Sequence, residues 1–208
     1  MKLPTLLLNA GGSSRRMGRP KALLPMPGSA TPLIRHIASQ LLPLAADLLV
    51  IANDPAIADA LNPLPARWLT DAYPDTGPLG GLATGLAASS GWCICVACDL
   101  PFVQPSLFGY LLNQTSDDWD TIVPRIEGRL QLLHALYHPR CLPAIEAALH
   151  SNKRRMDDFL PGVRTRFVTE EEIRPFDPHL RSFINVNTPE EWAWLVGQTE
   201  SPTYGTSQ

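Results

Sequence analysis

Apolar and polar positions follow a repeated order along the chain: a short apolar run, a polar loop, then a longer amphipathic stretch. Short apolar runs bounded by glycine, proline or asparagine are typical of buried strands in a parallel sheet. An antiparallel pair of strands is expected around Glu127-Gly128. The predicted strands cover residues 3–8, 48–52, 67–69, 92–97, 121–124, 133–137, 164–168 and 183–184.

Helices are predicted between most of these strands. Asp54-Pro55 places a capping carboxylate before a first-turn proline, and Thr188 and Glu191 have the spacing of a capping box. Strands that alternate with helices indicate an α/β fold, here a three-layer α/β/α sandwich around a mostly parallel sheet. We expect a single domain over residues 1–197 and a frayed polar tail over 198–208. The predicted helices cover residues 32–44, 55–61, 80–88, 105–113, 139–149, 154–160 and a last segment from 188.

Composition and charge exclude several classes of function. The chain is 45% hydrophobic and 18% charged, which is ordinary for a globular protein, and its net charge of −3 offers no general surface for nucleic acid. The apolar run at residues 6–8 is too short for the core of a signal peptide, and no stretch approaches the ~20 apolar residues of a membrane span. We therefore expect a cytoplasmic protein that binds neither nucleic acid nor membrane.

Three of the four cysteines stand close together in the run WCICVACDLP. Strand alternation sends Cys98 to the face opposite Cys93 and Cys95, and no histidine stands nearby with zinc-ligand spacing. We expect buried thiols in a reducing compartment, not a metal site.

Polar or glycine-rich clusters follow the carboxyl ends of successive predicted strands. In an open α/β sheet, ligands bind in the crevice outside those ends, so separate segments converge on one expected site. The clusters are residues 9–21, Asn53, Asp71, Asp99 and the pair Asn185 and Asn187.

The first cluster, NAGGSSRRMGRPK, has the chemistry of a phosphate-binding loop. Glycines let backbone N–H groups approach phosphate oxygens closely, and Arg15, Arg16 and Lys21 supply positive charge. The segment is neither a P-loop, which needs Gly-Lys-Ser/Thr, nor a G-x-G-x-x-G dinucleotide fingerprint.

Several motifs together resemble the MobA-like family, the molybdenum-cofactor guanylyltransferases. They occur in the family's order, and the resemblance extends from residue 5 to about 196. The first loop is shared with many sugar nucleotidyltransferases, whereas the combination of the later motifs is narrower. The motifs are AGGSSRRMGRPK at 10–21, TGPLGG at 76–81, CDLPF at 98–102, LHALY at 133–137 and NVNTPEE at 185–191.

The resemblance implies a magnesium-dependent reaction between GTP and molybdopterin, with or without its molybdenum. The terminal phosphate of molybdopterin attacks the α-phosphorus of GTP, and pyrophosphate leaves. A phosphate monoester is largely ionised at neutral pH, so this reaction needs charge neutralisation and alignment more than a general base. The family also implies transient contacts with molybdenum-insertion and recipient enzymes.

By the same resemblance, Lys21 and Arg16 contact the triphosphate, and Asp99 is the expected Mg²⁺ ligand and the third catalytic residue. Mg²⁺ is commonly held by one or two carboxylates together with substrate phosphates and water. The simpler alternatives are a solvated loop lysine for Lys21 and a helix-capping role for Asp99.

The remaining nucleotide contacts are also implied by the family. Asp71 is expected at the base or ribose, with turn formation as its alternative role. The expected nucleotide-binding residues are Asn9, Ala10, Gly11, Gly12, Lys21, Asn53, Asp71, Gly77, Pro78, Leu79 and Gly80.

His134, Asn185 and Asn187 are the residues expected on the pterin or phosphate side. The two asparagines are two apart in an extended segment, so both side chains can face the same way. Asn187 could instead start the last helix, and His134 could be a core histidine with satisfied hydrogen bonds.

One departure from the family's pattern bears on the nucleotide. Members that use GTP often carry Asp before the loop lysine, whereas this chain has Gly18-Arg19-Pro20-Lys21, as cytidylyltransferases do. The GPLGG and LHALY segments favour guanine. The alternatives are a molybdopterin cytidylyltransferase, a sugar-1-phosphate nucleotidyltransferase and a non-catalytic protein that binds nucleotide and delivers cofactor.

Overall fold

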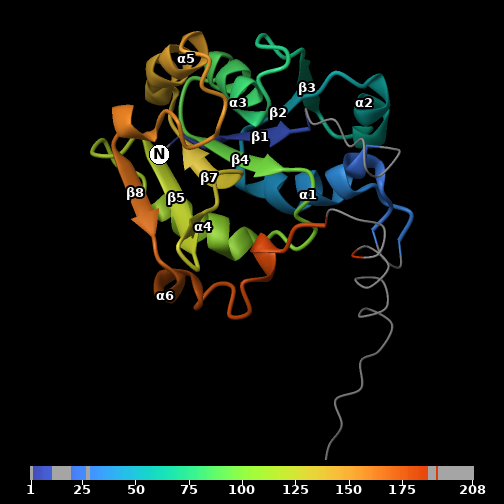
Figure 1. Cartoon of the computed structure of the whole chain (residues 1–208). Helices are drawn as coiled ribbons and strands as arrows, with labels where there is room; N and C mark the ends of the chain where they lie inside the picture. The colour runs from blue at the N-terminus through green and yellow to red at the C-terminus, as the bar shows by residue number, and fades with distance from the viewer. Residues whose placement is uncertain (1, 11–19, 27–28, 187–190, 192–208) are drawn as a thin grey trace, which may run out of the picture.

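A mixed sheet runs through the centre of the molecule (Figure 1). The structure is a computed structural model, and it describes residues 2–10, 20–26, 29–186 and 191. Within these residues the strand order is β3-β2-β1-β4-β7-β5-β6, and β8 pairs with β5. The strands are β1 (Thr5–Asn9), β2 (Asp47–Ile51), β3 (Ala66–Leu69), β4 (Cys93–Ala97), β5 (Thr121–Ile126), β6 (Arg129–Leu130), β7 (His134–Tyr137) and β8 (Thr165–Val168).

The sheet has a parallel half and a mixed half. Strands β1 to β4 are all parallel, and Leu7 at the middle of β1 pairs with Leu49 of β2 and Cys95 of β4. Strand β7 runs antiparallel between β4 and β5, while β8 is parallel to β5. The mostly parallel sheet is therefore confirmed, and so is the antiparallel pairing of β5 with β7. The carboxyl ends of β1–β5 and β8 all reach one edge of the sheet.

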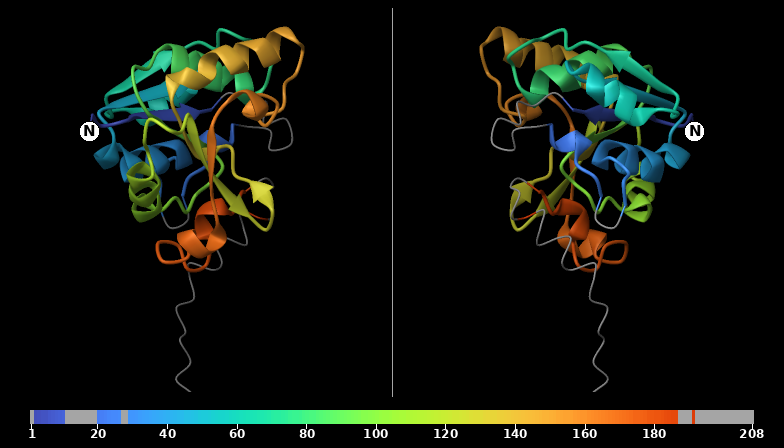
Figure 2. Two further views of the ribbon diagram at one scale, coloured as in Figure 1. Left: turned by 90° about the vertical axis from the view of Figure 1, so that its left-hand side faces the viewer. Right: turned by 90° about the vertical axis from the view of Figure 1, so that its right-hand side faces the viewer.

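Helices cover both faces of the sheet, as the edge-on views show (Figure 2). Helices α3 and α5 lie on one face, and α1 and α4 lie on the other, beside α2. The helices are α1 (Leu33–Leu41), α2 (Pro55–Leu61), α3 (Pro78–Ala87), α4 (Pro105–Asn113), α5 (Leu142–His150) and α6 (Glu170–Ile173). Short 3₁₀ turns are η1 (Lys21–Leu23), η2 (Leu42–Leu44), η3 (Pro139–Cys141), η4 (Leu160–Gly162) and η5 (Arg181–Phe183).

Alternation along the strands divides the apolar core between the two faces. Leu6 and Leu8 pack with α1, α2 and α4, whereas Leu7 packs with α3 and α5. Cys93 and Cys95 join the α3 side and Cys98 joins the α1 side, which confirms the predicted division of these thiols. All four cysteines are buried and unpaired.

The start of α2 follows the predicted chemistry. The Asp54 carboxylate accepts a hydrogen bond from the Ala56 N–H at 3.0 Å, and Pro55 occupies the first turn, where its missing N–H costs nothing.

Two predicted elements are wrong. Residues 154–160 form a bend and turns followed by η4, in which the Asp158 carboxylate accepts from the Arg155 N–H. Residues 183–184 form the end of η5 and its cap instead of a strand. The helix expected from 188 and the tail over 198–208 lie outside the described residues, apart from Glu191. No described helix is long and apolar enough to cross a membrane.

Candidate active site

Polar residues from four parallel strands meet at the carboxyl edge of the sheet. Asn9 ends β1, Asn53 follows β2, Asp71 follows β3 and Asp99 follows β4. Because β1–β4 are adjacent and parallel, these positions lie along one edge, as the sequence predicts.

Lys21 and Asp99 form an ion pair at this edge. The Lys21 Nζ lies 3.6 Å from Asp99 Oδ2, and the two side chains are 21% and 26% exposed, so both are accessible to a ligand. Lys21 opens η1 directly after Pro20, whose fixed φ sets the approach of the chain. Burial raises the pKa of the Asp99 carboxyl, and the Lys21 ammonium partly offsets that rise. The structure thus brings together two of the three predicted catalytic residues.

The backbone of Asp99 is held by a segment from the other end of the chain. The Val186 N–H donates to the Asp99 carbonyl at 3.0 Å. Asn185 precedes Val186 and is exposed, so this hydrogen bond places it next to Asp99. Gly11, Gly12, Arg16 and Asn187, which the family implies at the same site, lie outside the described residues.

Asn9 joins the end of β1 to the start of α3. Its side chain is buried, and its Nδ2 donates to the Pro78 carbonyl at 2.8 Å. The absence of a side chain at Gly81 makes this possible, because a Cβ there would lie 2.7 Å from Asn9 Nδ2. Ala10 continues the same connection, since its N–H donates to the Ile51 carbonyl of β2. Asn9 therefore positions neighbouring segments of the site.

The turn before α3 requires glycine. Gly77 caps the helix at a φ of 71°, a conformation that side-chain-bearing residues rarely adopt. Gly80 packs so closely that a Cβ would lie 2.7 Å from the Tyr73 carbonyl. Pro78 occupies the first turn and Leu79 is fully buried. Since α3 follows β3, its N-terminal end, with the positive end of the helix dipole, faces the site edge.

Asp71 holds the loop between β3 and α3. Its Oδ1 accepts from the Tyr73 N–H at 2.9 Å and lies 3.1 Å from the Thr84 hydroxyl. That hydroxyl also lies 3.0 Å from the Gly80 carbonyl, and its single proton serves one acceptor at a time. Asp71 therefore stabilises a turn, which is the alternative role that we considered for it from the sequence. Thr84, on the inner face of α3, is a contributor that no local sequence signal identifies.

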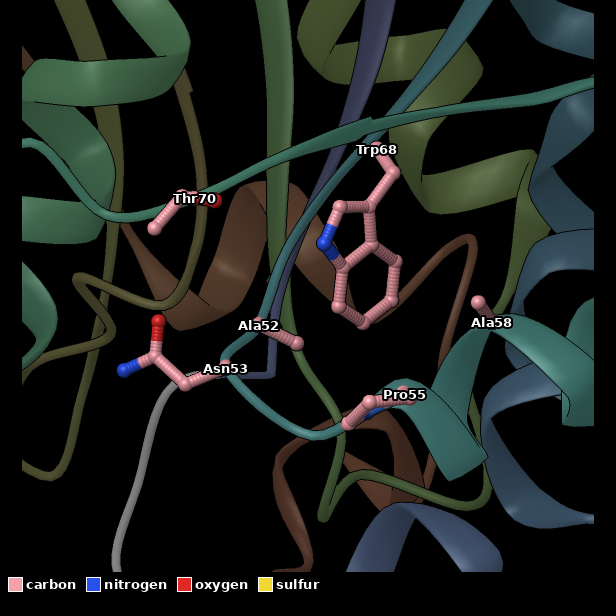
Figure 3. Close-up of a pocket in the computed structure, with 6 residues that line it drawn as sticks. All are labelled: Ala52, Asn53, Pro55, Ala58, Trp68 and Thr70. Carbon is pink, nitrogen blue, oxygen red and sulfur yellow. The ribbon is translucent and has the colours of Figure 1, made fainter.

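Asn53 borders a pocket of about 320 Å³ beside the parallel strand ends (Figure 3). The Trp68 indole projects from β3 toward Ala52 and Pro55, while the Asn53 amide lies on the Thr70 side of the pocket. The pocket's lining is Ala52, Asn53, Pro55, Ala58, Trp68 and Thr70.

His134 does not lie at the open edge. It is 1% exposed and packs between the rings of Phe108 and Phe183, with centroid distances of 4.4 and 4.9 Å. Neither ring nitrogen has a hydrogen-bond partner within the described part of the chain. Burial lowers the pKa of this imidazole to about 3. His134 is thus a core histidine. It lacks the satisfied hydrogen bonds that we expected of a core histidine from the sequence.

The donor set at this edge suits a cation that is shared with a substrate. Among the described residues, no group of three or more His, Cys, Asp and Glu side chains could enclose a metal ion. The partly exposed Asp99 carboxylate is one oxygen donor beside a lysine, which matches Mg²⁺ held jointly by a carboxylate, phosphates and water.

Comparison with known sequences gives consistent results. Residues 6–163 match the family described as "MobA-like NTP transferase domain". A protein of Pelotomaculum thermopropionicum named "Probable molybdenum cofactor guanylyltransferase" is 37% identical over 188 residues, covering 90% of this chain and 89% of that protein. A protein of Bacillus cereus with the same name is 34% identical over 186 residues, covering 88% and 90%.

Solved structures share the fold. The molybdopterin-guanine dinucleotide biosynthesis protein A of Archaeoglobus fulgidus has a TM-score of 0.80 at 24% identity, covering 94% of this chain and 98% of that one. The 2-C-methyl-D-erythritol 4-phosphate cytidylyltransferase of Thermus thermophilus has a TM-score of 0.67 at 17% identity, covering 97% and 100%. The architecture is therefore common to chains that differ widely in sequence.

Proposed function

The chain belongs to the MobA-like NTP transferase family, and from that premise we propose that it transfers GMP from GTP to the terminal phosphate of molybdopterin. The products are the guanine dinucleotide form of the cofactor and pyrophosphate. An oxygen–phosphorus bond forms between the acceptor phosphate and the α-phosphorus, and the bond between the α-phosphorus and the bridging oxygen breaks.

The Lys21–Asp99 pair is the observation that carries this proposal. A cation and a carboxylate stand 3.6 Å apart, both accessible, where the glycine-rich segment joins β1 to η1. The names of relatives at 31–37% identity over about nine-tenths of the chain support guanine as the base and molybdopterin as the acceptor.

A divalent metal is a general requirement of nucleotidyltransferases of this family. We propose Mg²⁺, held by Asp99 together with phosphate oxygens; when bound, it would neutralise charge on the triphosphate.

The chain's own residues align and stabilise the reacting groups. Lys21 places a fixed positive charge against the triphosphate, and we propose that Arg16 and the N–H groups of Gly11 and Gly12 add to it. We propose that Asn185, beside Asp99, contacts the acceptor phosphate and that Asn187 assists it. We do not assign His134 to the pterin, because it is buried beneath Phe183.

Base and ribose recognition falls to the neighbouring strand ends. We propose that Asn53 and the turn at Gly77–Gly80 frame the base, and that Asp71 fixes the loop between β3 and α3. The cytidylyl alternative rests on Pro20 before Lys21, and competition between nucleotides decides between the guanylyl and the cytidylyl activity.

We also propose a cytoplasmic location, where thiols stay reduced and GTP is supplied. Transient contacts with molybdenum-insertion and recipient enzymes would hand over the cofactor.

Thermal melting with Mg²⁺ and each of GTP, CTP, ATP and UTP tests nucleotide binding. A ligand at about 100 times its Kd adds about 2.7 kcal/mol, which raises the Tm of a domain of this size by about 5–11 °C. We expect this rise with GTP alone. A rise with CTP instead would favour the cytidylyl activity, and no rise with any nucleotide would contradict the proposal.

Turnover is tested with α-labelled GTP and molybdopterin, followed by release of pyrophosphate. Asp99→Asn should abolish label transfer while the protein stays folded, because the amide cannot hold the cation as the carboxylate does. Asp47→Asn, which changes a carboxylate at the start of β2 on the opposite edge, is the matched control and should transfer label normally. Binding of GTP without transfer by the wild-type chain would indicate a non-catalytic delivery protein.

A further inference from the structure

The segment after α6 closes over the loop that carries Asp99. Residues 177–186, which we name the C-terminal clasp, contact residues 99–102 at three points. The Val186 N–H donates to the Asp99 carbonyl at 3.0 Å, and the Ser182 hydroxyl lies 3.4 Å from the Phe102 carbonyl. The Arg181 guanidinium stacks on the Phe102 ring, 4.2 Å from its centroid. Two backbone carbonyls and one aromatic ring of the loop therefore depend on the clasp.

Asp99 needs such a partner because it lies beyond the sheet. Strand β4 ends at Ala97, whose N–H still bonds to the Leu133 carbonyl, so the strand ladder fixes the backbone only up to that point. An aspartate has a short side chain with two rotatable bonds, and the position of its carboxylate follows its backbone. The hydrogen bond from Val186 extends this order to the Asp99 backbone.

Asp177 organises the clasp itself. It is 3% exposed, and its two oxygens receive separate backbone hydrogen bonds, Oδ1 from the Arg181 N–H at 3.0 Å and Oδ2 from the Ser182 N–H at 2.8 Å. Leu180, directly before Arg181, adopts a φ of 53°, a left-handed conformation that residues with a Cβ rarely adopt. The two charge-assisted bonds stabilise this turn, and the turn directs Arg181, Ser182 and the following residues onto the loop.

We propose that Asp177 is a positioning residue for the Asp99 carboxylate, acting through the clasp on the backbone of residues 99–102. This inference rests on the proposed function, since it assigns Asp99 to the cation. Asp177 itself touches no substrate in this proposal. Its role is to hold the oxygen donor of Asp99 where the cation and the triphosphate require it.

The test measures metal binding directly, with Mn²⁺ in place of Mg²⁺ and a GTP analogue whose α,β bridge is not cleaved. Mn²⁺ affinity is followed by electron paramagnetic resonance, and analogue affinity is measured separately without metal. Asp177→Asn keeps the shape but presents one acceptor oxygen where two N–H donors need one each. We expect Mn²⁺ binding to weaken about tenfold, as for other residues that orient metal ligands. Metal-free analogue affinity should stay unchanged.

Two further variants separate positioning from general stability. Val186→Pro removes the N–H that binds Asp99 and leaves Asp177 in place, so it should weaken Mn²⁺ binding similarly and tests the proposal even if Asp177→Asn fails to fold. Asp120→Asn changes another buried carboxylate that accepts a backbone N–H, but at the opposite edge of the sheet. It should lower the Tm without changing Mn²⁺ affinity.

The outcomes distinguish the two proposals. Weaker Mn²⁺ binding in Asp177→Asn and Val186→Pro, with Asp120→Asn unaffected, supports the positioning role. Unchanged Mn²⁺ affinity in a folded Asp177→Asn or Val186→Pro variant overturns it and leaves the proposed function intact. Failure of the wild-type chain to bind the analogue or Mn²⁺ overturns the proposed function, and the positioning role with it.

Discussion

At the scale of single residues, the fold uses buried polar side chains mainly to shape the site. Within the described residues, Asn9, Thr84, Asp177 and Ser182 are buried around the carboxyl edge, and each has a hydrogen-bond partner. His134 differs, because it is buried among aromatic rings with neither nitrogen bonded. Its desolvation cost is not offset by a hydrogen bond from any described residue, although the nearby Asp177 carboxylate partly counters the effect of burial on its pKa.

Replacing His134 should change the acid stability of the protein. Burial holds the pKa of His134 at about 3 in the folded state, against 6.5 as the ordinary value. Between these pH values the unfolded chain binds a proton at His134 and the folded chain does not. The free energy of unfolding therefore falls as pH drops from about 6.5 toward 3, by about 2 kcal/mol at pH 5. Denaturant unfolding at pH 7 and pH 5 should show a smaller loss in His134→Phe than in the wild-type chain.

A second substitution at His134 separates the effect of losing a titrating ring from the effect of burying a polar group. His134→Gln also lacks the titrating ring and should lose the same part of the pH dependence, but it keeps a buried polar group and should be less stable than His134→Phe at pH 7. Equal pH dependence in the wild-type chain and both variants would contradict this account. Nucleotide binding should persist in His134→Phe if the imidazole has no part in the site.

At the scale of elements, α3 lies unusually close to the strand that ends in the site. Gly81 admits the Asn9 amide, and Gly85 admits the Leu7 side chain, since a Cβ at Gly85 would lie 2.4 Å from Leu7 Cδ1. The close contact allows Asn9 to reach the Pro78 carbonyl and so ties the end of β1 to the first turn of α3.

Gly81→Ala should therefore damage both stability and nucleotide binding. Its Cβ would meet the Asn9 amide at 2.7–2.8 Å, and relief of that overlap should cost about 1–3 kcal/mol. We expect a Tm lower by several degrees and a smaller rise in Tm on addition of GTP and Mg²⁺.

Gly109→Ala is the matched control for this substitution. Gly109 lies inside α4, and nothing lies within 4 Å of a Cβ built there. Alanine at an unobstructed helical position stabilises by about 0.5–1 kcal/mol relative to glycine, so its Tm should rise and GTP binding should be unaltered. Equal behaviour of the two variants would mean that the contact between α3 and β1 does not restrict the site.

At the scale of the whole molecule, the candidate site and a group of stabilising ion pairs lie at opposite edges of the sheet. The site lies at the carboxyl edge, while Asp120 lies just before β5 at the other edge. Its carboxylate accepts from the guanidinium groups of Arg140 and Arg164 and from the Arg164 N–H, which joins β5 to η3 and to the start of β8. The hydrogen bonds from Arg164, with those from Arg140, hold the pKa of Asp120 well below its ordinary value.

Asp120→Asn should lower stability without affecting function. Loss of the paired charge should cost about 2 kcal/mol at pH 7 and lower the Tm by about 4–8 °C. Because the folded pKa is depressed, this contribution is present above the unfolded pKa and is lost as pH falls through the folded value. The difference from the wild-type chain should therefore shrink below pH ~4.

The exposed pair of Asp47 and Arg67 provides the control for that experiment, because Asp47→Asn should cost less than about 1 kcal/mol. GTP binding should be normal in both variants. Loss of GTP binding in folded Asp120→Asn would show that the two edges are coupled.

Much of this architecture could be predicted from sequence because its signals are local. Apolar runs predict β1, β2 and β4, and Asp54-Pro55 predicts the start of α2. The gathering of Asp71 and Asp99 at one edge follows from parallel strands. The strand expected at residues 183–184 is wrong because this segment is held in the clasp. The packing of His134 between Phe108 and Phe183 likewise depends on residues far apart in the sequence. No periodicity in the sequence reports such contacts.

The hydrogen bond between Val186 and Asp99 also sets an order of events during synthesis. A ribosome adds roughly 5–20 residues per second, so Asp99 emerges several seconds before Val186. During that interval a growing chain already contains β1–β4 and Lys21 but lacks the donor that fixes Asp99. The Asp99 carboxylate, which we propose as the cation ligand, therefore gains its backbone partner only after all the described strands have been made.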